Sequence, residues 1–221
     1  MPSPALSVST YGPIGPIYAR LAQLYSGGAI PGCHRWAVEK LPQGARVLIV
    51  GSGPGTDVLH AARAGMRVTA LDIDAAMLAA AQRRLLRAQP AAQVEFVHAD
   101  LLQEPASSRF DVVIAQFFLN VFAPSRLPRV LRALAGQLQP GGRLLVGDFA
   151  PLAPGRPVLQ RLYHDLPMHV FGRLGANAIH AVHDLPTHLR EAGFILQQRR
   201  RFRLFGIGPR WIEGLEAHHP Q

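Results

Sequence analysis

The segment from residue 46 to residue 57, RVLIVGSGPGTD, constrains this chain more than any other. Its opening VLIV is an unbroken apolar run, which is typical of a strand buried on both faces of a parallel sheet. Three glycines at alternate positions follow, and glycine permits positive φ angles and leaves main-chain amides open to a ligand. The next residues have helical spacing, with Thr56 or Asp57 expected to cap the helix and Gly65 to end it. Strand, glycine loop and helix predict the first half of a nucleotide-binding unit.

A carboxylate follows the next predicted strand, residues 67–71. Asp72 lies 21 residues after Gly51. About 20 residues is the separation at which an acid at the tip of the second strand accepts hydrogen bonds from both hydroxyls of a ribose. We therefore predict that Asp72 binds a ribose. The simpler alternative is that it only caps the helix over residues 75–89, a role that we expect of Asp74.

The glycine spacing also bears on the kind of nucleotide. The pattern is G-x-G-x-G followed by Thr56 and Asp57, whereas dinucleotide-binding loops read G-x-G-x-x-G. A pyrophosphate at this helix start would face the carboxylate of Asp57, which is unfavourable, but a ligand with nearby cationic groups is tolerated. S-adenosylmethionine carries a sulfonium and an ammonium. A nicotinamide-dependent reductase is the alternative that this spacing disfavours.

Strands and helices alternate through the chain. Strands are expected near 46–50, 67–71, 93–98, 110–116 and 142–149, and two more near the C-terminus. Helices are expected at about 17–25 and 33–40, between the strands, after Pro157 and at about 186–192. The pattern predicts an α/β fold with a doubly wound, mostly parallel seven-stranded sheet and N-terminal helices. Ligands bind such sheets beyond the carboxyl ends of the strands, here between the first and fourth.

Five segments in order resemble the motifs of class I SAM-dependent methyltransferases: GSGPGTD, ALDID, HAD, FDVVIAQFF and LQPGGRLLVGDF. The resemblance covers about residues 44–150. It implies a Rossmann-like methyltransferase fold, methyltransferase activity and S-adenosyl-L-methionine as cofactor. In this resemblance the loop at 51–53 approaches the methionine part, Asp72 the ribose, Asp100 with Leu101 the adenine, and Gln116 the transferable methyl. The implied cofactor-binding residues are Gly51, Ser52, Gly53, Asp72, Ile73, Asp100, Leu101 and Gln116.

One position departs from the family pattern. The family usually has an acidic residue two positions before the first glycine, where this chain has Ile49. Asp57 is the nearest replacement in sequence for holding the ammonium of the cofactor. The departure keeps open the alternative of a non-catalytic binding protein with a degenerate SAM pocket.

The methyl acceptor is expected to contact the N-terminal region and the loop after the fourth strand. Phe117 and Asn120 are predicted to contact a small, apolar or aromatic acceptor, although phenylalanines here are also expected to pack in the core. The segment YGPIGPIY resembles the opening of ubiquinone and menaquinone C-methyltransferases without its acids, and DFAP followed by Tyr163 resembles a later segment of them. The chain is thus a distant relative of these enzymes, and their quinone substrate does not carry over. Tyr18 is predicted as a lid over the cofactor, or alternatively as a staple for the first helix.

Methyl transfer needs alignment and exclusion of water, and a general base is optional. His164 is the candidate base, with a surface or helix-end histidine as the alternative. Its neighbour Asp165 is on a different helical face, so we expect this carboxylate not to orient the ring. The later histidines have no matching acid cluster, so no metal site is predicted.

Charge and composition limit the partners. The net charge is +9, and Lys40 is the only lysine. The densest basic run, at 199–201 with Arg203, fits a late strand with one solvated face better than a phosphate or nucleic-acid patch. An RNA methyltransferase remains an alternative function because of the basic balance.

The 221 residues suit a single domain, which we divide into an N-terminal helical lid (1–43), a cofactor-binding core (44–150) and substrate-side helices with the last strands (151–221). Cys33 is the only cysteine, which excludes an intrachain disulfide and favours the reducing cytoplasm. No signal-like start and no run of about 18 apolar residues appear, so no membrane span is expected. We expect a monomer or a homodimer.

Overall fold

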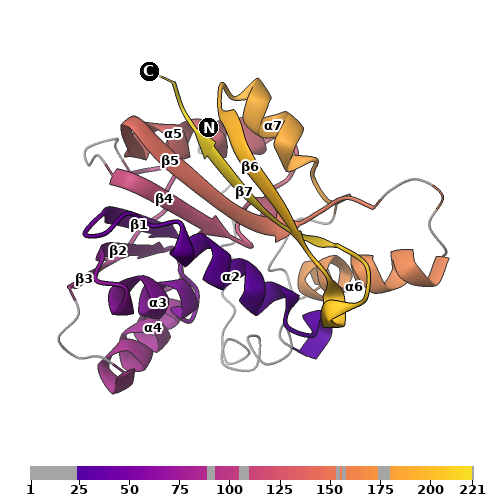
Figure 1. The fold of residues 1–221 in the computed structure, drawn as a ribbon, viewed down its shortest axis with the longest axis horizontal. Coiled ribbons are helices and arrows are strands. Elements are labelled where there is room, and N and C mark those ends of the chain that lie inside the picture. The colour runs from indigo at the N-terminus through magenta and orange to yellow at the C-terminus, as the bar shows by residue number, and fades with distance from the viewer. Residues whose placement is uncertain are drawn as a thin grey trace, which may run out of the picture.

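The computed structural model describes residues 24–88, 93–104, 110–152, 155, 158–173 and 180–220. Its centre is a seven-stranded sheet in the order β3-β2-β1-β4-β5-β7-β6 (Figure 1). β7 is antiparallel to both of its neighbours, and the other pairs are parallel. The doubly wound, mostly parallel seven-stranded sheet predicted from the sequence is confirmed. The strands are β1 (Arg46–Val50), β2 (Arg67–Asp72), β3 (Val94–His98), β4 (Phe110–Gln116), β5 (Leu138–Phe149), β6 (Ile195–Phe202) and β7 (Ile212–His218).

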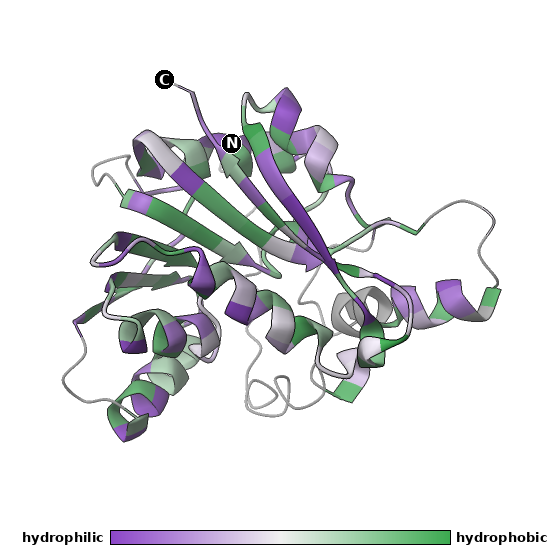
Figure 2. Cartoon of the chain, in the orientation of Figure 1, coloured by the Kyte–Doolittle hydropathy of each residue, from purple (hydrophilic) through white to green (hydrophobic). Residues whose placement is uncertain are grey.

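Helices cover both faces of the sheet. Successive residues of β1 point to opposite sides: Val47 and Ile49 pack with α2 and α3, and Leu48 and Val50 with α5 and α7. Figure 2 shows the hydrophobic β4 and β5 in the middle of the sheet and the hydrophilic β6 at its edge. The helices are α2 (Ala29–Glu39), α3 (Thr56–Arg63), α4 (Ala75–Ala88), α5 (Leu127–Gln137), α6 (Val158–Arg173) and α7 (Leu185–Glu191), with short 3-10 turns η2 (Leu119–Val121) and η3 (Leu204–Gly206).

Two elements begin earlier than predicted. α2 begins at Ala29 instead of Cys33, because Pro31 falls in the first turn, where its missing N–H costs no helical hydrogen bond. β5 begins at Leu138, directly after α5, and a register shift lies between the pair Leu138–Phe110 and the pair Arg143–Val112, with the extra residues in β5. The helix expected at 17–25 falls mostly outside the described residues, as does Tyr18.

The division of the domain into a lid, a core and a substrate-side part at residues 43 and 150 stays a prediction.

None of the helices within the described ranges is long and apolar enough to cross a membrane.

The glycine loop has the backbone that its sequence predicts, but its helix starts differently. Gly51, Gly53 and Gly55 all have positive φ, at 59°, 51° and 81°. Gly55 is the N-cap of α3 and no side chain caps it, so the expected cap by Thr56 or Asp57 is wrong. Both residues are already helical. The Thr56 hydroxyl instead accepts from Arg84 at 3.0 Å, and the Asp57 carboxylate contacts His34.

Gly55 also lets α3 approach α4 closely, which gives a test with a matched control. A Cβ on Gly55 would lie 2.8 Å from the Ala81 main chain, whereas Gly65, with a similar φ of 79°, has nothing within 4 Å. Gly65→Ala should cost only the strain of a left-handed alanine, about 1 kcal/mol. Gly55→Ala should cost that strain plus a backbone clash, roughly 2–4 kcal/mol in total. Urea unfolding of both variants measures the difference. Equal losses would mean that the close approach of α3 and α4 does not matter.

Candidate active site

The loops after β1, β2 and β4 meet at the carboxyl edge of the sheet. β1 lies between β2 and β4, so Gly51, Asp72 and Gln116, which end or follow these strands, lie on neighbouring strand ends. The amide of Ser52 donates to the Leu71 carbonyl at 3.2 Å, which extends the β1–β2 pairing into the glycine loop. The sheet order therefore assembles the first, second and fourth of the predicted site segments.

The carboxylate of Asp72 holds two loops together. One oxygen, Oδ2, accepts from the Gly53 amide at 2.8 Å, and the other, Oδ1, accepts from the Asp74 amide at 2.9 Å. Burial raises the pKa of Asp72 above its usual value, although these hydrogen bonds oppose the rise. Asp74 caps α4 as predicted, because its Oδ1 accepts from the Ala76 amide at 2.8 Å. Since a carboxylate has about four acceptor sites, Asp72 retains capacity for the hydroxyl groups of a ligand.

Two buried polar atoms, one in the loop after β1 and one in the last residue of β4, have no hydrogen-bond partner among the described residues. They are Ser52 Oγ, after β1, and Gln116 Nε2, at the end of β4. The carbonyl oxygen of the Gln116 side chain accepts from the thiol of Cys33 at 3.5 Å, so the amide nitrogen faces away from that contact. Buried donors and acceptors in folded proteins are nearly always satisfied. Beside them, a Cβ on Gly53 would meet nothing closer than 3.9 Å, so a ligand has room to reach the backbone here.

The remaining predicted cofactor residues flank Asp72. Ile73, directly after it, exposes 41% of its surface, which is unusual for a large apolar side chain. Asp100 makes a local turn, with Oδ1 accepting from the Leu102 amide at 2.9 Å. Leu101 is buried in the core, so only its main chain is available to a ligand.

A histidine–aspartate pair that the sequence analysis missed lies between the glycine loop and β4. His34 Nδ1 is 2.8 Å from Asp57 Oδ1, and the His34 side chain is 16% exposed. Its ring centroid lies 5.5 Å from that of Phe117, which follows β4. Because a carboxylate only accepts, Nδ1 carries the proton and Nε2 of the neutral ring keeps a lone pair. No local sequence signal joins His34 to Asp57, since tertiary packing of α2 on α3 creates the pair.

The residues after β4 lie in two surroundings: Phe117 contacts the ring of Phe149, whereas Asn120 is buried beside His183. Phe117 has a positive φ of 53° and its ring contacts that of Phe149 at 5.7 Å. Phe118 packs over Gly51, where a Cβ would come within 2.5 Å of the Phe118 ring. Asn120 is 3% exposed, and its side-chain oxygen accepts from the His183 amide at 2.9 Å. Contact of Phe117 and Asn120 with an acceptor stays a prediction.

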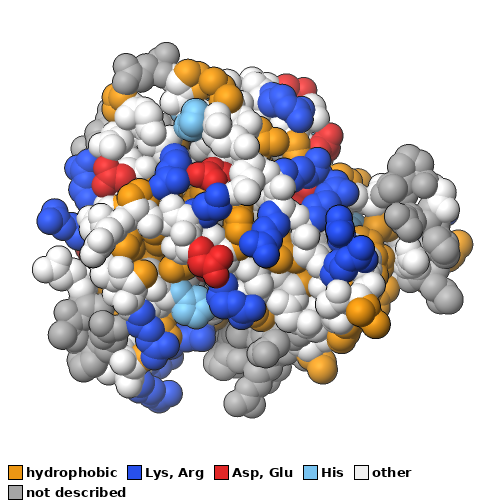
Figure 3. Space-filling view, viewed as in Figure 1, with side chains coloured by type: hydrophobic (Ala, Val, Ile, Leu, Met, Phe, Trp, Pro, Cys, Tyr) orange, Lys and Arg blue, Asp and Glu red, His pale blue; other side chains and the backbone are white. Residues whose placement is uncertain are grey.

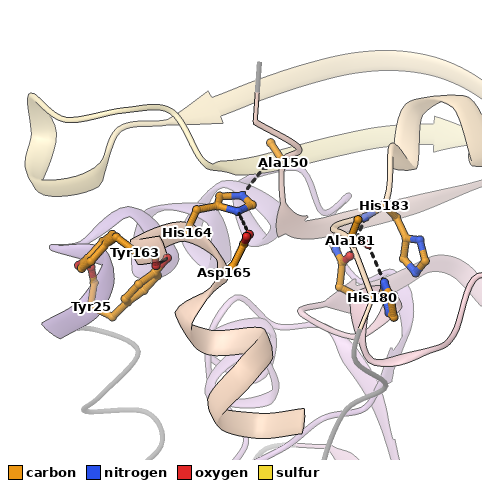
Figure 4. Close-up of polar contacts among 9 residues, drawn as sticks. Tyr25, Ala150, Tyr163, His164, Asp165, His180, Ala181 and His183 are labelled. Carbon is orange, nitrogen blue, oxygen red and sulfur yellow. Dashed lines mark hydrogen bonds and ion pairs between the residues drawn. The ribbon is translucent and has the colours of Figure 1, made fainter. Parts of the chain in front are cut away.

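An aromatic cluster continues from Phe117 towards α6. Tyr25 stacks on Tyr163 with ring centroids 4.8 Å apart, and each hydroxyl donates to the main-chain carbonyl of the other (Figure 4). Trp211 lies 5.8 Å from Tyr163. Burial, with Tyr163 nearby, raises the pKa of Tyr25, so this phenol stays protonated. Rings that precede α2, belong to α6, end β5 and precede β7 thus converge with Phe117 in one cluster.

His164 is buried in the same region, with both ring nitrogens engaged. Nε2 lies 2.9 Å from the Ala150 carbonyl, and Nδ1 lies 2.8 Å from Asp165 Oδ1 (Figure 4). The expectation that Asp165 would not orient the ring is therefore wrong, because the Asp165 side chain turns back along α6. With acceptors at both nitrogens, neither is left free towards a ligand. His180 and His183 stack at 4.3 Å, and the described part of the chain has no group of three or more His, Cys, Asp or Glu that is placed to hold a metal ion.

Asp148, at the end of β5, binds the loop after its neighbouring strand β4, as Asp72 binds the loop after β1. It is 1% exposed, and Oδ2 accepts from the amides of Leu119 and Asn120 at 3.2 and 3.1 Å. Oδ1 accepts from the Phe149 amide at 2.8 Å. Burial raises the pKa of Asp148 from 3.8 to about 6, against the opposing effect of these hydrogen bonds.

Comparison with known proteins matches nearly the same part of the chain as the sequence motifs do. Residues 47–142 match the family described as "Methyltransferase domain". The ubiquinone/menaquinone biosynthesis C-methyltransferase UbiE of Ectopseudomonas mendocina (strain ymp) is 35% identical over 154 residues, which are 66% of this chain and 58% of that enzyme. The chain spans about half the length of the relatives that it matches.

Two solved structures share the fold over nearly the whole chain. The 1,6-didemethyltoxoflavin-N1-methyltransferase of Burkholderia thailandensis, solved with S-adenosylhomocysteine, has a TM-score of 0.66 at 19% identity and covers 100% of this chain and 94% of its own. The [4+2]-cyclase SpnF has a TM-score of 0.67 at 20% identity, covering 96% and 97%. A cyclase and a methyltransferase thus match this fold equally well, so the fold alone does not determine the reaction.

The raised pKa of Asp148 makes stability depend on pH. The folded protein keeps a proton that the unfolded chain has already lost between about pH 4 and 6, so the unfolding free energy falls as pH rises through this window, by roughly 3 kcal/mol. Asp148→Asn should remove most of this decline, as measured by urea unfolding from pH 4 to 7. Asp111→Asn is the control: despite some burial, hydrogen bonds from Arg46 lower the pKa of Asp111, so it titrates below this window. An unchanged slope in Asp148→Asn would contradict the assignment.

Proposed function

We propose that the protein transfers a methyl group from S-adenosylmethionine to a small organic acceptor, a proposal supported by the match of residues 47–142 to the family described as "Methyltransferase domain". The observation that carries the proposal is a pair of buried polar atoms that have no partner among the described residues: Ser52 Oγ, within the glycine loop that Asp72 holds, and Gln116 Nε2, at the end of the neighbouring strand β4. A ligand with polar groups at this edge satisfies both atoms.

The residues present fit this cofactor. Asp72 has acceptor capacity for ribose hydroxyls, exposed Ile73 offers an apolar surface to the adenine, and Asp100 with the Leu101 main chain lies at the next strand end. The open backbone at Gly53 admits the methionine part. When bound, the cofactor supplies a methyl group already activated by its sulfonium.

The ammonium of the cofactor needs a negative partner, and the family's usual acid is absent. Ile49 is buried among side chains of α2 and α3, so this position is apolar here. Asp57, in the first turn of α3, is the carboxylate that we assign to the ammonium side of the site. Its bond to His34 uses Oδ1, and a carboxylate has further acceptor sites.

The acceptor that this site suits is small and apolar or aromatic. Aromatic rings of Phe117, Phe149, Tyr25, Tyr163 and Trp211 form one cluster, and Phe117 directly follows Gln116, the residue that we assign beside the transferable methyl group. Such rings favour a flat, apolar molecule and exclude water from the transfer. We also propose a cytoplasmic site of action, supported by the single cysteine, which is buried.

His34 is better placed than His164 to take a proton from the acceptor. The Asp57 contact fixes the His34 tautomer and leaves Nε2 with a lone pair, whereas both nitrogens of His164 face protein acceptors. The ring of His34 also lies against Phe117, at the end of β4. We assign His34 as the general base and His164 as a residue that ties α6 to the end of β5.

Cofactor binding is tested by titrating the protein with S-adenosylhomocysteine in a calorimeter. We expect micromolar binding that Asp72→Asn weakens by about 1.5–3 kcal/mol, since it removes charged hydrogen bonds to the ribose. Asp74→Asn is the matched control, because Asp74 is equally buried in the same loop but caps α4. No binding by the unmodified protein would favour a scaffold with a degenerate pocket, and unchanged binding by Asp72→Asn would refute the ribose assignment.

The base is tested with methyl-labelled S-adenosylmethionine and a panel of phenols, hydroquinones and amines. For an acceptor that is methylated, His34→Gln should lower kcat by about 10²-fold or more, with the affinity for S-adenosylhomocysteine unchanged. His188→Gln, a half-buried histidine on α7 outside the candidate site, serves as the control. If His164→Gln lowers kcat in this way and His34→Gln does not, the assignment of the base is reversed.

A further inference from the structure

Exposed apolar side chains gather at one end of the molecule. Of the nine large apolar side chains exposed in the described ranges, six lie on three neighbouring segments. Val158, Leu162 and Leu166 are spaced four residues apart and form a stripe along α6, with 65%, 62% and 47% exposure. Phe205 and Ile207, at the tip of the β6–β7 hairpin, are 57% and 89% exposed, and Leu24 is 75% exposed.

Contacts between these segments make them one surface. The stacking of Tyr25 on Tyr163 places Leu24 beside α6, and a Cβ on Gly27 would overlap the Phe205 ring, which places the hairpin tip against the same turn. Trp211, the last residue of the loop that joins β6 to β7, contacts Tyr163 of α6. Figure 1 shows α6 and the hairpin tip at the same end of the molecule. We call this surface the hairpin end.

Arginines border the hairpin end. An open groove of about 380 Å³ runs between the start of α2 and the hairpin, lined by Arg200, Arg201, Arg203 and Arg210 together with glycines. Buried Glu213 pairs with Arg199 and Arg201, while Arg200, Arg203 and Arg210 form no ion pair with any carboxylate of the described residues. Lys and Arg side chains gather over the hairpin with hydrophobic side chains beside them (Figure 3).

We propose that the hairpin end docks onto the surface of an anionic lipid bilayer. Phe205, Ile207 and the α6 stripe enter the headgroup region, while the groove arginines contact lipid phosphates. Apolar side chains bordered by cations are the combination that binds such an interface. Binding of this kind at the membrane surface requires no helix that crosses the bilayer.

Two other occupants fit the surface less well. A nucleic acid would use the arginines but gain little from the aliphatic Ile207 and α6 stripe, since it is bound by stacking on aromatic rings. A second copy of the chain would bring two arginine grooves together, and like charges across an interface are unfavourable. Only a lipid surface uses the charge and the apolar side chains together.

The full chain should cosediment with vesicles of equal parts phosphatidylcholine and phosphatidylglycerol, and only weakly with phosphatidylcholine alone. Ile207→Ser and Leu162→Ser should each weaken binding roughly tenfold or more. Arg210→Gln should weaken it about fivefold and reduce its salt dependence. The controls are Ile195→Ser, exposed at the opposite end of the same hairpin, and Arg87→Gln on α4. Melting temperatures verify that every variant is folded.

The proposal is overturned if the chain fails to bind anionic vesicles, or binds them with Ile207→Ser and Leu162→Ser unchanged. It is also overturned if the chain binds an RNA oligonucleotide more tightly than it binds the vesicles and the Ile207→Ser substitution leaves this RNA binding unchanged. A dimer in solution that Ile207→Ser dissociates would instead assign the hairpin end to a contact between copies. None of these measurements requires a methyl acceptor, so they stand apart from the test of the proposed function.

Discussion

The site depends on two buried carboxylates that hold the loops of neighbouring strands. Asp72 ends β2 and accepts from the amide of Gly53 in the loop after β1. Asp148, in β5, accepts from the amides of Leu119 and Asn120 in the loop after β4. β1 and β4 are the central pair, so the candidate cleft lies between two loops that are each fixed by the acid of the outer neighbour. A buried charge persists only when hydrogen bonds compensate its desolvation, and here the loop amides provide them.

This arrangement fixes backbone while it leaves side chains free for a ligand. Carboxylates bind the Gly53 amide of the glycine loop and the Leu119 and Asn120 amides of the turn after β4. Ser52 Oγ and Gln116 Nε2, in contrast, have no partner among the described residues. Cys33 contributes in a neutral form, since burial, with Asp57 and Asp148 nearby, raises the pKa of its thiol and keeps it a donor to Gln116. The strand ends are therefore rigid, and the unsatisfied polar atoms point to the chemistry of the ligand.

Much of the fold was predictable because its signals are local. The apolar run in β1, the three glycines and the position of Asp72 follow from strand burial, backbone freedom and chain length, and the structure has the predicted sheet. The errors also have local causes. The cap of α3 was misassigned because a glycine in the left-handed conformation already fills the N-cap position. α2 begins earlier than predicted because its first turn accepts Pro31, and β5 begins ahead of Gly141 and Gly142.

Other features of the site come from packing between distant segments. His34 and Asp57 meet only because α2 crosses the start of α3, and the aromatic cluster joins residues more than a hundred positions apart. The arginine run in β6 shows the same limit. Residues 197–201 are exposed, as expected of a solvated strand face, but only the structure pairs Arg199 and Arg201 with buried Glu213 and places Arg203 along the groove.

The sequence by itself determined the order of strands and helices, the nucleotide-type loop and the acid at the tip of β2, because each depends on neighbours within about 20 residues. The tertiary structure alone decided which side chains pair across the cleft, which polar atoms stay unsatisfied and which apolar residues remain outside. The physical reason is that burial and pairing depend on distances in space between segments that no local pattern relates.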